Sequence, residues 1–171
     1  MTGTEHRDAV DAIVDQWREQ RPDLPDLLPM ALLGRMTRCS LLIQKQMAEC
    51  FRRHDLQLGE FDVLASLRRA GEPYTLAPTA LFSMLMVSSG TMTHRLQGLE
   101  KRGLVERIPD PEDARSMLVR LSAAGLERVD LVVADHLANE DSLLTGLDAA
   151  QRQSLNDLLR LWLHHLESRL A

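Results

Sequence analysis

The sequence has few aromatic residues and no long apolar run. Aromatic side chains make up 4% of its 171 residues, and hydrophobic residues as a whole make up 44%. The core must therefore be built from Leu, Val, Met and Ala, which favours a mainly helical fold. No segment reaches the roughly 18 uninterrupted apolar residues of a membrane-spanning helix, and the first residues carry acids where a signal peptide is apolar. We expect one soluble, cytoplasmic domain with no membrane partner.

Cysteine is also scarce, which limits the redox chemistry open to the chain. Cys39 and Cys50 are eleven residues apart on one predicted helix. At about 1.5 Å per residue they are too far apart for a disulfide within one subunit. We expect reduced thiols that pack as small apolar residues.

Motifs of catalysis are missing as well. The chain has no glycine-rich phosphate loop, no nucleophile elbow and no HExxH motif. Three histidines, His136, His164 and His165, belong to the C-terminal helices, but no cysteine or acid stands at a spacing typical of metal ligands. These absences disfavour an enzyme and predict neither a cofactor nor a metal site.

Negative charge is in excess only near the two ends of the chain. The formal net charge is -5. Residues 1–26 hold three basic against seven acidic residues, and residues 122–171 hold four against eight. Residues 27–87 hold seven basic against five acidic residues, and residues 88–121 hold six against five. The middle of the chain can therefore offer a basic face to nucleic acid, although the net charge weakens non-specific attraction to phosphate.

Apolar periodicity predicts helices through the first half of the chain. Apolar residues three or four positions apart indicate a short helix over 6–19, a long one from about 28 to 54, and two more near 59–70 and 77–85. Three prolines between the first two helices mark a stiff connector.

The pattern changes after residue 87. A helix near 88–102 buries apolar residues on one face and ends at Gly103. Strands are expected over 104–108 and 117–121, joined by PDPEDARS, whose prolines and acids suit an exposed hairpin tip. A helix followed by a ribbon with a charged tip is the outline of a winged helix that reads DNA.

Two long helices complete the chain. Ser122 can cap the first, and Asp148 with Gln151 has the spacing of a capping box at the start of the second. The last helix carries a wide apolar stripe, as does one side of the first helix of the chain. Pairing both with a second subunit is the economical solution, because a twofold dimer sets two recognition helices about one DNA turn apart. Packing within one subunit is the alternative.

Small and polar residues begin the helix near 88–102. Hydroxyls at a helix N-terminus can bind a phosphate together with the free backbone N–H groups, and the next polar side chains can reach base edges in the major groove. Ordinary capping is the alternative for each hydroxyl, and a solvated side chain is the alternative for His94. The expected DNA contacts are Ser88, Ser89, Thr91, Thr93, His94 and Gln97.

The order of these elements resembles the MarR family of dimeric winged helix-turn-helix regulators. The resemblance covers about residues 30–170 and is most specific in GTMTHRLQGLEKRGLVER and in DPEDARSMLVRLSAAG. It implies a homodimeric transcriptional repressor bound to palindromic, double-stranded operator DNA. It also implies that Arg115 of the wing enters the minor groove while Asp113 steadies the hairpin. Ala114 departs from the basic residue often found between them, which weakens the expected phosphate contact.

A narrower resemblance is to the urate-responsive (PecS/HucR-type) subgroup. It rests on Trp17 in an added N-terminal helix, Asp62 in EFDVL, Arg95 in THRL and Arg107 in VER. It implies that both arginines bind an anion, that Trp17 stacks on or hydrogen-bonds to its ring, and that the arriving charge repels Asp62. Urate or another purine is the first candidate ligand, and a carboxylate metabolite is the alternative. Trp17 as a core residue, Arg95 as a phosphate contact and a purely structural Asp62 to Arg95 ion pair are the competing interpretations.

We thus predict a mainly α fold with a small β-wing, a winged helix-turn-helix with N- and C-terminal dimerisation helices. Its four parts are an N-terminal extension helix and linker (1–26), a dimer or scaffold helix (27–57), a winged helix-turn-helix DNA-binding lobe (58–121) and C-terminal dimerisation helices (122–171).

Two other functions compete with a ligand-responsive regulator. A redox-sensing MarR-type regulator would use Cys39 or Cys50, which is disfavoured because both lie inside a helix without an obvious activating base. A helical protein-interaction module without DNA binding would use the acidic ends of the chain as its partner surface.

Overall fold

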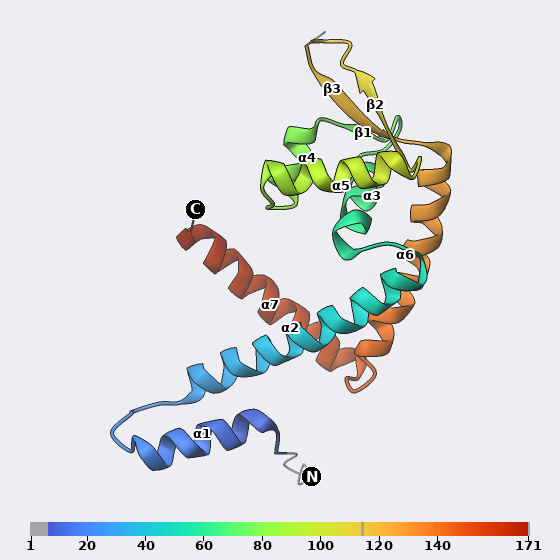
Figure 1. Ribbon diagram of the computed structural model, residues 1–171. Helices are drawn as coiled ribbons and strands as arrows, with labels where there is room; N and C mark the ends of the chain where they lie inside the picture. The colour runs from blue at the N-terminus through green and yellow to red at the C-terminus, as the bar shows by residue number, and fades with distance from the viewer. Residues whose placement is uncertain (1–6, 114, 171) are drawn as a thin grey trace. The chain divides into compact units, whose positions relative to one another are not determined.

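The computed structural model describes residues 7–113 and 115–170, in two compact units, Met1–Gln46 and Met47–Ala171. Both are mainly helical, and the second contains a small antiparallel sheet, which confirms the predicted fold class (Figure 1). Within the described ranges, every helix is too short or too polar to cross a membrane.

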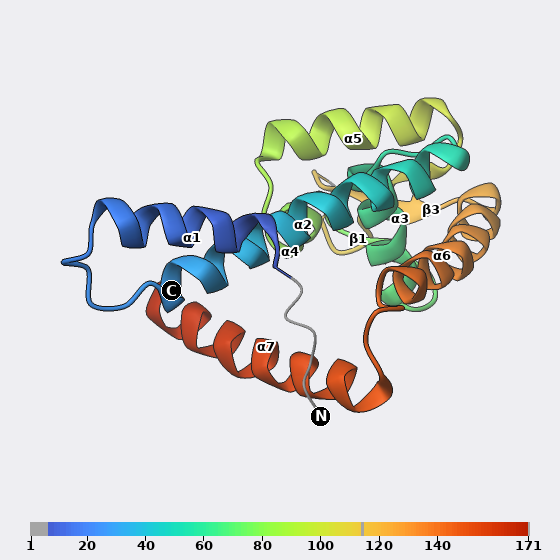
Figure 2. The same ribbon diagram turned by 90° about the horizontal axis from the view of Figure 1, so that it is seen from below.

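The first unit consists of helix α1, Ala9–Gln20, and the first part of helix α2, Leu28–Arg53. These segments run antiparallel, joined by the proline-containing connector (Figures 1 and 2). Their shared core is small: Val10 and Val14 of α1 pack with Ala31 of α2. Both helices lie within three residues of the bounds expected from apolar periodicity.

The second unit contains the rest of α2 and all later elements. Its core is built almost entirely from aliphatic residues, with two phenylalanines, Phe51 and Phe61, stacked at 4.5 Å between ring centroids. The helices are α3 (Leu58–Arg69), α4 (Pro78–Met84), α5 (Ser89–Lys101), α6 (Ala123–Leu143) and α7 (Ala149–Leu170).

Within the described residues the sheet has three strands, β1 (Thr75–Leu76), β2 (Val105–Pro109) and β3 (Met117–Leu121), in the order β1-β3-β2. The β2–β3 hairpin runs from the pair Val105 and Leu121 to the pair Pro109 and Met117, close to the predicted strands. Strand β1 was not predicted, because two residues are too few to show an alternating pattern.

Local capping signals fix where the later helices begin. Ser88 Oγ accepts the N–H of Thr91 at 3.2 Å at the start of α5, and Ser122 Oγ accepts the N–H of Gly125 at 3.0 Å at the start of α6. The predicted capping box of α7 is present, since Asp148 and Gln151 each accept the other's backbone N–H at 2.9 Å. These bonds satisfy donors that a helix start leaves free.

Many apolar side chains remain exposed in each unit. Cys50 is buried, but the expectation that both cysteines are packed is wrong for Cys39, which is exposed on α2. Periodicity identifies an apolar helix face without saying what covers it. The exposed apolar residues include Leu32, Leu33, Leu41 and Leu42 in the first unit, and Leu131, Leu137, Leu158, Leu161 and Leu163 in the second.

Candidate DNA-reading face and ligand site

Helix α5 buries one face and exposes the other. Met92, Leu96 and Leu99 are at most 2% exposed and pack into the core of the second unit. All six residues predicted to contact DNA from this helix are exposed. The helix therefore presents its polar face outward, with α4 and α3 packed behind it (Figure 1).

The hydroxyls at the start of α5 have local partners. Ser88 Oγ lies 2.9 Å from Thr91 Oγ1, in addition to capping the helix. Thr93 Oγ1 donates to the carbonyl of Ser89 at 2.8 Å. Each hydroxyl oxygen keeps a further lone pair after these bonds form. A hydroxyl that caps the helix can therefore also accept a hydrogen bond from a water molecule bound to a phosphate.

The remaining polar side chains of this face have more freedom. Within the described part of the chain, the side chains of Ser89, His94 and Gln97 make no hydrogen bond. His94 and Gln97 are three residues apart and therefore neighbours on the helix surface. Neither side chain would lose an internal hydrogen bond if it bound another molecule.

The tip of the β2–β3 hairpin is organised around Asp113. Its carboxylate accepts the backbone N–H of Arg115 at 3.0 Å, and its carbonyl accepts that of Ser116 at 2.8 Å. The N–H of Asp110 closes the turn on the carbonyl of Ser116 at 3.0 Å. The guanidinium of Arg115 is exposed and forms no ion pair with any described residue.

Arg95 points from α5 to the first turn of α3. A Cβ atom built on Gly59 would lie 2.3 Å from Cζ of Arg95, so the guanidinium occupies the space that a larger residue at position 59 would fill. Arg95 is half-buried, yet it makes no hydrogen bond or ion pair with the described residues. Its guanidinium therefore keeps all its N–H donors available for a further acceptor.

Asp62 lies one helical turn beyond Gly59 and is half-buried. Burial raises the pKa of its carboxyl, and the positive charges of Arg95, Arg69 and His136 oppose that rise without cancelling it. Among the described residues, no direct ion pair joins Asp62 to Arg95. The two side chains therefore influence one another through space and not through a direct bond.

Arg107 is held elsewhere in the same unit. Its Nε donates to Oε2 of Glu100 at 3.2 Å. Glu100 follows Arg95 by five residues on α5, which places it about 140° away around the helix axis. In this conformation Arg107 is directed to Glu100, whereas Arg95 is directed to α3.

Trp17 belongs to the other unit, on α1. Its side chain is 43% exposed, so it is not a fully packed core residue. Its indole N–H has no hydrogen-bond partner in the part of the chain that the structure describes. Of the four residues of the predicted ligand site, the structure thus brings Asp62 and Arg95 into electrostatic contact, and pairs Arg107 with Glu100.

Comparison with known proteins agrees with this architecture. Residues 56–117 match the MarR family. The chain is 39% identical over 150 residues to the HTH-type transcriptional regulator PecS of Dickeya dadantii, an alignment that covers 88% of this chain and 90% of PecS. The chain belongs to the MarR family.

Other known proteins are similar over comparable lengths. The HTH-type transcriptional repressor IacR of Pseudomonas putida is 27% identical over 158 residues, which cover 92% of this chain and 87% of IacR. A mutant MarR from E. coli, solved in complex with operator DNA, superposes with a TM-score of 0.68 at 27% identity, over 86% of this chain and 97% of that one. PecS is named as a transcriptional regulator and IacR as a transcriptional repressor, and both are similar to this MarR family protein over most of its length.

One bond and one close approach between α3 and the α5 segment of this MarR family protein were not predicted. Arg102 donates to Oε2 of Glu60 on α3 at 3.2 Å, beside an open pocket of about 240 Å³. A Cβ atom on Gly98 would lie 3.4 Å from Oε1 of Glu60. Sequence spacing gives no signal for such contacts, because they depend on how α3 and α5 cross. The glycine at position 59, one turn before Asp62, was the one visible hint of a close approach.

Proposed function

We propose that this protein is a homodimeric repressor that binds palindromic operator DNA and leaves it when a small anionic ligand binds at Arg95. Urate or a related purine is the first candidate ligand, and a carboxylate metabolite is the second. The similarity to PecS over most of both chains supports the assignment to a urate-responsive regulator.

One observation carries the ligand proposal: half-buried Arg95 makes no hydrogen bond or ion pair with the described residues, and the carboxyl of Asp62 acts on it only through space. A guanidinium in that position gains two charge-assisted hydrogen bonds from a planar anion such as urate. Burial has already raised the pKa of the neighbouring Asp62. An anion arriving beside Asp62 favours its protonated form further, which reduces the repulsion between them.

The route from ligand to DNA release follows from where the two arginines are anchored. Arg95 is on the recognition helix α5 and Arg107 is on strand β2 of the wing. Glu100 already holds Nε of Arg107 at 3.2 Å, so a ligand that binds this guanidinium competes with that carboxylate. DNA affinity then falls only if the ligand binds the rearranged state better than the DNA-bound state.

The dimer proposal rests on uncovered apolar surface. Leu131 and Leu137 on α6 are 58% and 66% exposed, and Leu158 and Leu161 on α7 are 66% and 70% exposed. Soluble monomers rarely leave such stretches bare. A second copy of the chain is the partner that also matches a palindromic operator.

The deciding experiment titrates urate into the purified protein bound to labelled DNA from its own promoter region. We expect urate to release the wild-type protein, and Arg95→Ala to bind DNA but fail to respond. Lys101→Ala is the matched control, because it removes an exposed cation from the end of the same helix. Undiminished wild-type binding at saturating urate would remove urate as the ligand, and the same titration with xanthine and then with an aromatic carboxylate would follow.

Redox sensing is a second candidate because Cys39 is exposed on α2, although Cys50 is only 1% exposed. An oxidant would reach Cys39 first. Treatment of the DNA-bound protein with peroxide, compared with the Cys39→Ser variant, tests this function independently of any anion. Equal behaviour of the two proteins would reject it.

A further inference from the structure

Four successive helix ends in the second unit place a residue in the left-handed region of backbone geometry. This residue stands two positions after the last residue of the helix in each case. The four are Asp55 after α2, Gly71 after α3, Met86 after α4 and Gly103 after α5, with φ of 55°, 78°, 49° and 67°. Glycine adopts this geometry freely, whereas a side chain brings Cβ close to its own backbone. Methionine is therefore an unfavourable choice at position 86.

The end of α4 imposes the left-handed geometry on Met86. The N–H of Met86 donates to the carbonyl of Ser83 at 3.3 Å, and the N–H of Val87 donates to the carbonyl of Phe82 at 3.1 Å. This pair of bonds closes many helices, and glycine is usual at the position that Met86 occupies. Val87 and Phe82 both pack against the core, which fixes the path of the turn. The same pair of bonds closes α5 around Gly103.

The other non-glycine residues in this geometry have contacts that explain them. In the described part of the chain they are Asp55 and Tyr74. Aspartate tolerates left-handed geometry, and the carboxylate of Asp55 accepts a bond from Arg102 at 3.3 Å. Tyr74 packs against the core, and Arg68 lies over its ring at 5.1 Å. The side chain of Met86, by contrast, is 93% exposed, so packing within the subunit does not offset its conformational cost.

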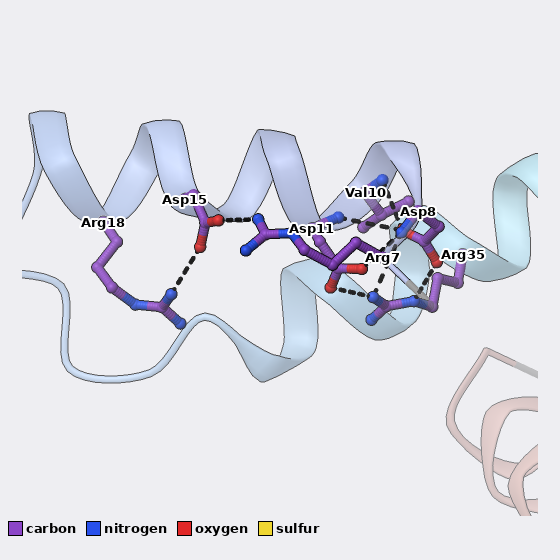
Figure 3. Close-up of polar contacts among 7 residues, drawn as sticks. All are labelled: Arg7, Asp8, Val10, Asp11, Asp15, Arg18 and Arg35. Carbon is purple, nitrogen blue, oxygen red and sulfur yellow. Dashed lines mark hydrogen bonds and ion pairs between the residues drawn. The ribbon is translucent and has the colours of Figure 1, made fainter. Parts of the chain in front are cut away.

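Polar contacts at the surface do not explain Met86 either. Such contacts do hold exposed charged residues in the first unit, where Nε of Arg35 donates to Oδ2 of Asp8 at 2.8 Å and the same guanidinium binds Asp11 (Figure 3). A thioether forms only weak hydrogen bonds. Backbone strain that the rest of the chain does not repay is typical of functional positions. We therefore consider a partner molecule at Met86.

The turn at Met86 belongs to the part of the fold that would meet DNA. Met86 precedes Ser88, the N-cap of α5, by two residues, and it joins α4 to α5, which pack against one another (Figure 1). In a helix-turn-helix the first helix crosses the sugar–phosphate backbone and the start of the second enters the major groove. The turn between these helices therefore lies beside the backbone of the DNA.

The large apolar side chains exposed in the DNA-binding lobe are all methionines. Among the described residues of 58–121 they are Met84, Met86 and Met117. Met84 ends α4, and Met117 begins β3 in the hairpin whose tip carries Arg115. Methionine is unbranched and polarisable, so it adapts to the shape of a partner surface. All three are therefore on segments of the lobe that a winged helix brings to DNA.

We propose that Met86 is a DNA-contacting residue, whose side chain packs against a deoxyribose of the operator beside the phosphate at the start of α5. This inference rests on the proposed function, in which α5 reads operator DNA. Deoxyribose is the apolar part of the DNA backbone, and every nucleotide carries it. The contact therefore adds affinity without distinguishing bases. Because methionine is uncharged, the contact displaces no counterions from the DNA.

Variants of the full-length protein separate the backbone cost of Met86 from its contact with DNA. Met86→Gly and Met86→Asn suit the left-handed geometry but lack the apolar side chain, whereas Met86→Leu keeps both the strain and an apolar group. We expect the Gly and Asn variants to melt at no lower temperature than wild type. They should bind labelled DNA from the protein's own promoter region about three- to tenfold more weakly. Met86→Leu should bind within about twofold of wild type.

Two further measurements identify the kind of contact. Anisotropy titrations with promoter DNA and with unrelated DNA of the same length should show the same fold loss for Met86→Gly, and this loss should not change with salt. Met86→Lys should steepen the salt dependence by about one unit of slope, because it places a cation beside the DNA backbone. Ser168→Lys, at an exposed position of α7, is the matched control and should keep the wild-type slope.

The outcomes separate this inference from the proposed function. If wild type binds no DNA, the proposed function fails and the inference fails with it. If wild type binds DNA and the Gly and Asn variants bind equally well, the proposed function stands and the contact at Met86 is rejected. Lower melting temperatures in both variants would show that Met86 supports the fold instead.

Three other results would also overturn the deoxyribose contact. One is a Leu variant that binds as weakly as the Gly variant, which would exclude apolar packing. Another is a Lys variant with the wild-type salt slope, which would place position 86 away from the DNA backbone. The third is a loss confined to promoter DNA, which would assign the contact to a base.

Discussion

The guanidinium of Arg95 lies in the space where a side chain at Gly59 would begin, with Cζ 2.3 Å from an ideal Cβ position. The backbone of α3 at Gly59 therefore lies directly against the guanidinium of Arg95, which we propose as the ligand-binding cation. Because the obstructed group is the far end of a flexible side chain, a methyl group at position 59 should move Arg95 without moving either helix.

Gly59→Ala should therefore separate stability from sensing. We expect a change in unfolding free energy of less than about 1 kcal/mol, because alanine favours the helix while Arg95 must shift. The urate concentration that releases DNA should rise several-fold. Thermal unfolding and DNA-release titrations measure the two effects. Gly98→Ala, on the facing surface of α5 with ordinary contact distances, is the control that should retain the wild-type response.

Asp62→Asn should stabilise the protein at neutral pH. Burial raises the pKa of Asp62 above its ordinary 3.8, so the folded chain binds more protons than the unfolded chain between 3.8 and the raised value. Stability is lost as pH rises through that window and does not return above it. Thermal unfolding at a series of pH values should show an advantage of the Asn variant at pH 7 that narrows toward pH 4. A less stable variant at pH 7 would contradict this account.

Gly125→Ala should be strongly destabilising. A Cβ atom there would lie 1.9 Å from the carbonyl oxygen of Leu104, and neither backbone can yield without separating α6 from β2. We expect a loss of about 2 to 4 kcal/mol in unfolding free energy, measured by denaturant titration. Gly146→Ala has open space around its Cβ position and should change stability by less than about 1 kcal/mol.

Arg115→Ala should weaken DNA binding without affecting the fold. Its exposed guanidinium has no ion pair among the described residues, so its removal costs few internal contacts. We expect about a tenfold loss of operator affinity and a shallower salt dependence, by about one unit of slope. Anisotropy titrations at several salt concentrations measure both, with Arg169→Ala as the control. An interaction module without DNA binding would show neither steep salt dependence nor any effect of Arg115.

Leu158→Glu should convert a dimer into monomers. The side chain is 66% exposed on α7 in the single chain, so a glutamate there costs little unless a second subunit covers it. Light scattering after size-exclusion chromatography gives the mass directly. Ser168→Glu, an exposed polar position of the same helix, should leave the wild-type mass unchanged. A monomeric wild-type protein would contradict the dimer outright.

The elements that sequence predicted best are those set by neighbours along the chain. Ser88, Ser122 and Asp148 cap helices through bonds to residues three positions away, so their signals are local. Strand β1 forms because Thr75 pairs with Arg120, forty-five residues later. No local sequence pattern predicts that pairing. The exposure of Cys39 was not predicted for a related reason: an apolar helix face does not indicate whether another element covers it.

The candidate site shows the same difference between local sequence signals and contacts that depend on the fold. The residue types and register of Asp62, Arg95 and Arg107 could be recognised in the sequence. The placement of Arg95 over Gly59 and of Arg107 against Glu100 could not, because both follow from how α5 crosses α3 and meets β2.

The contact between Arg107 and Glu100 has a consequence for the threshold of the sensor. Glu100 is a built-in competitor, tethered at 3.2 Å from a guanidinium that an anionic ligand would need. An ion pair at the surface is worth about 0 to 1 kcal/mol, so displacing Glu100 would raise the ligand concentration needed for a response by at most about fivefold. Removing this carboxylate would therefore make the proposed sensor respond at a lower ligand concentration.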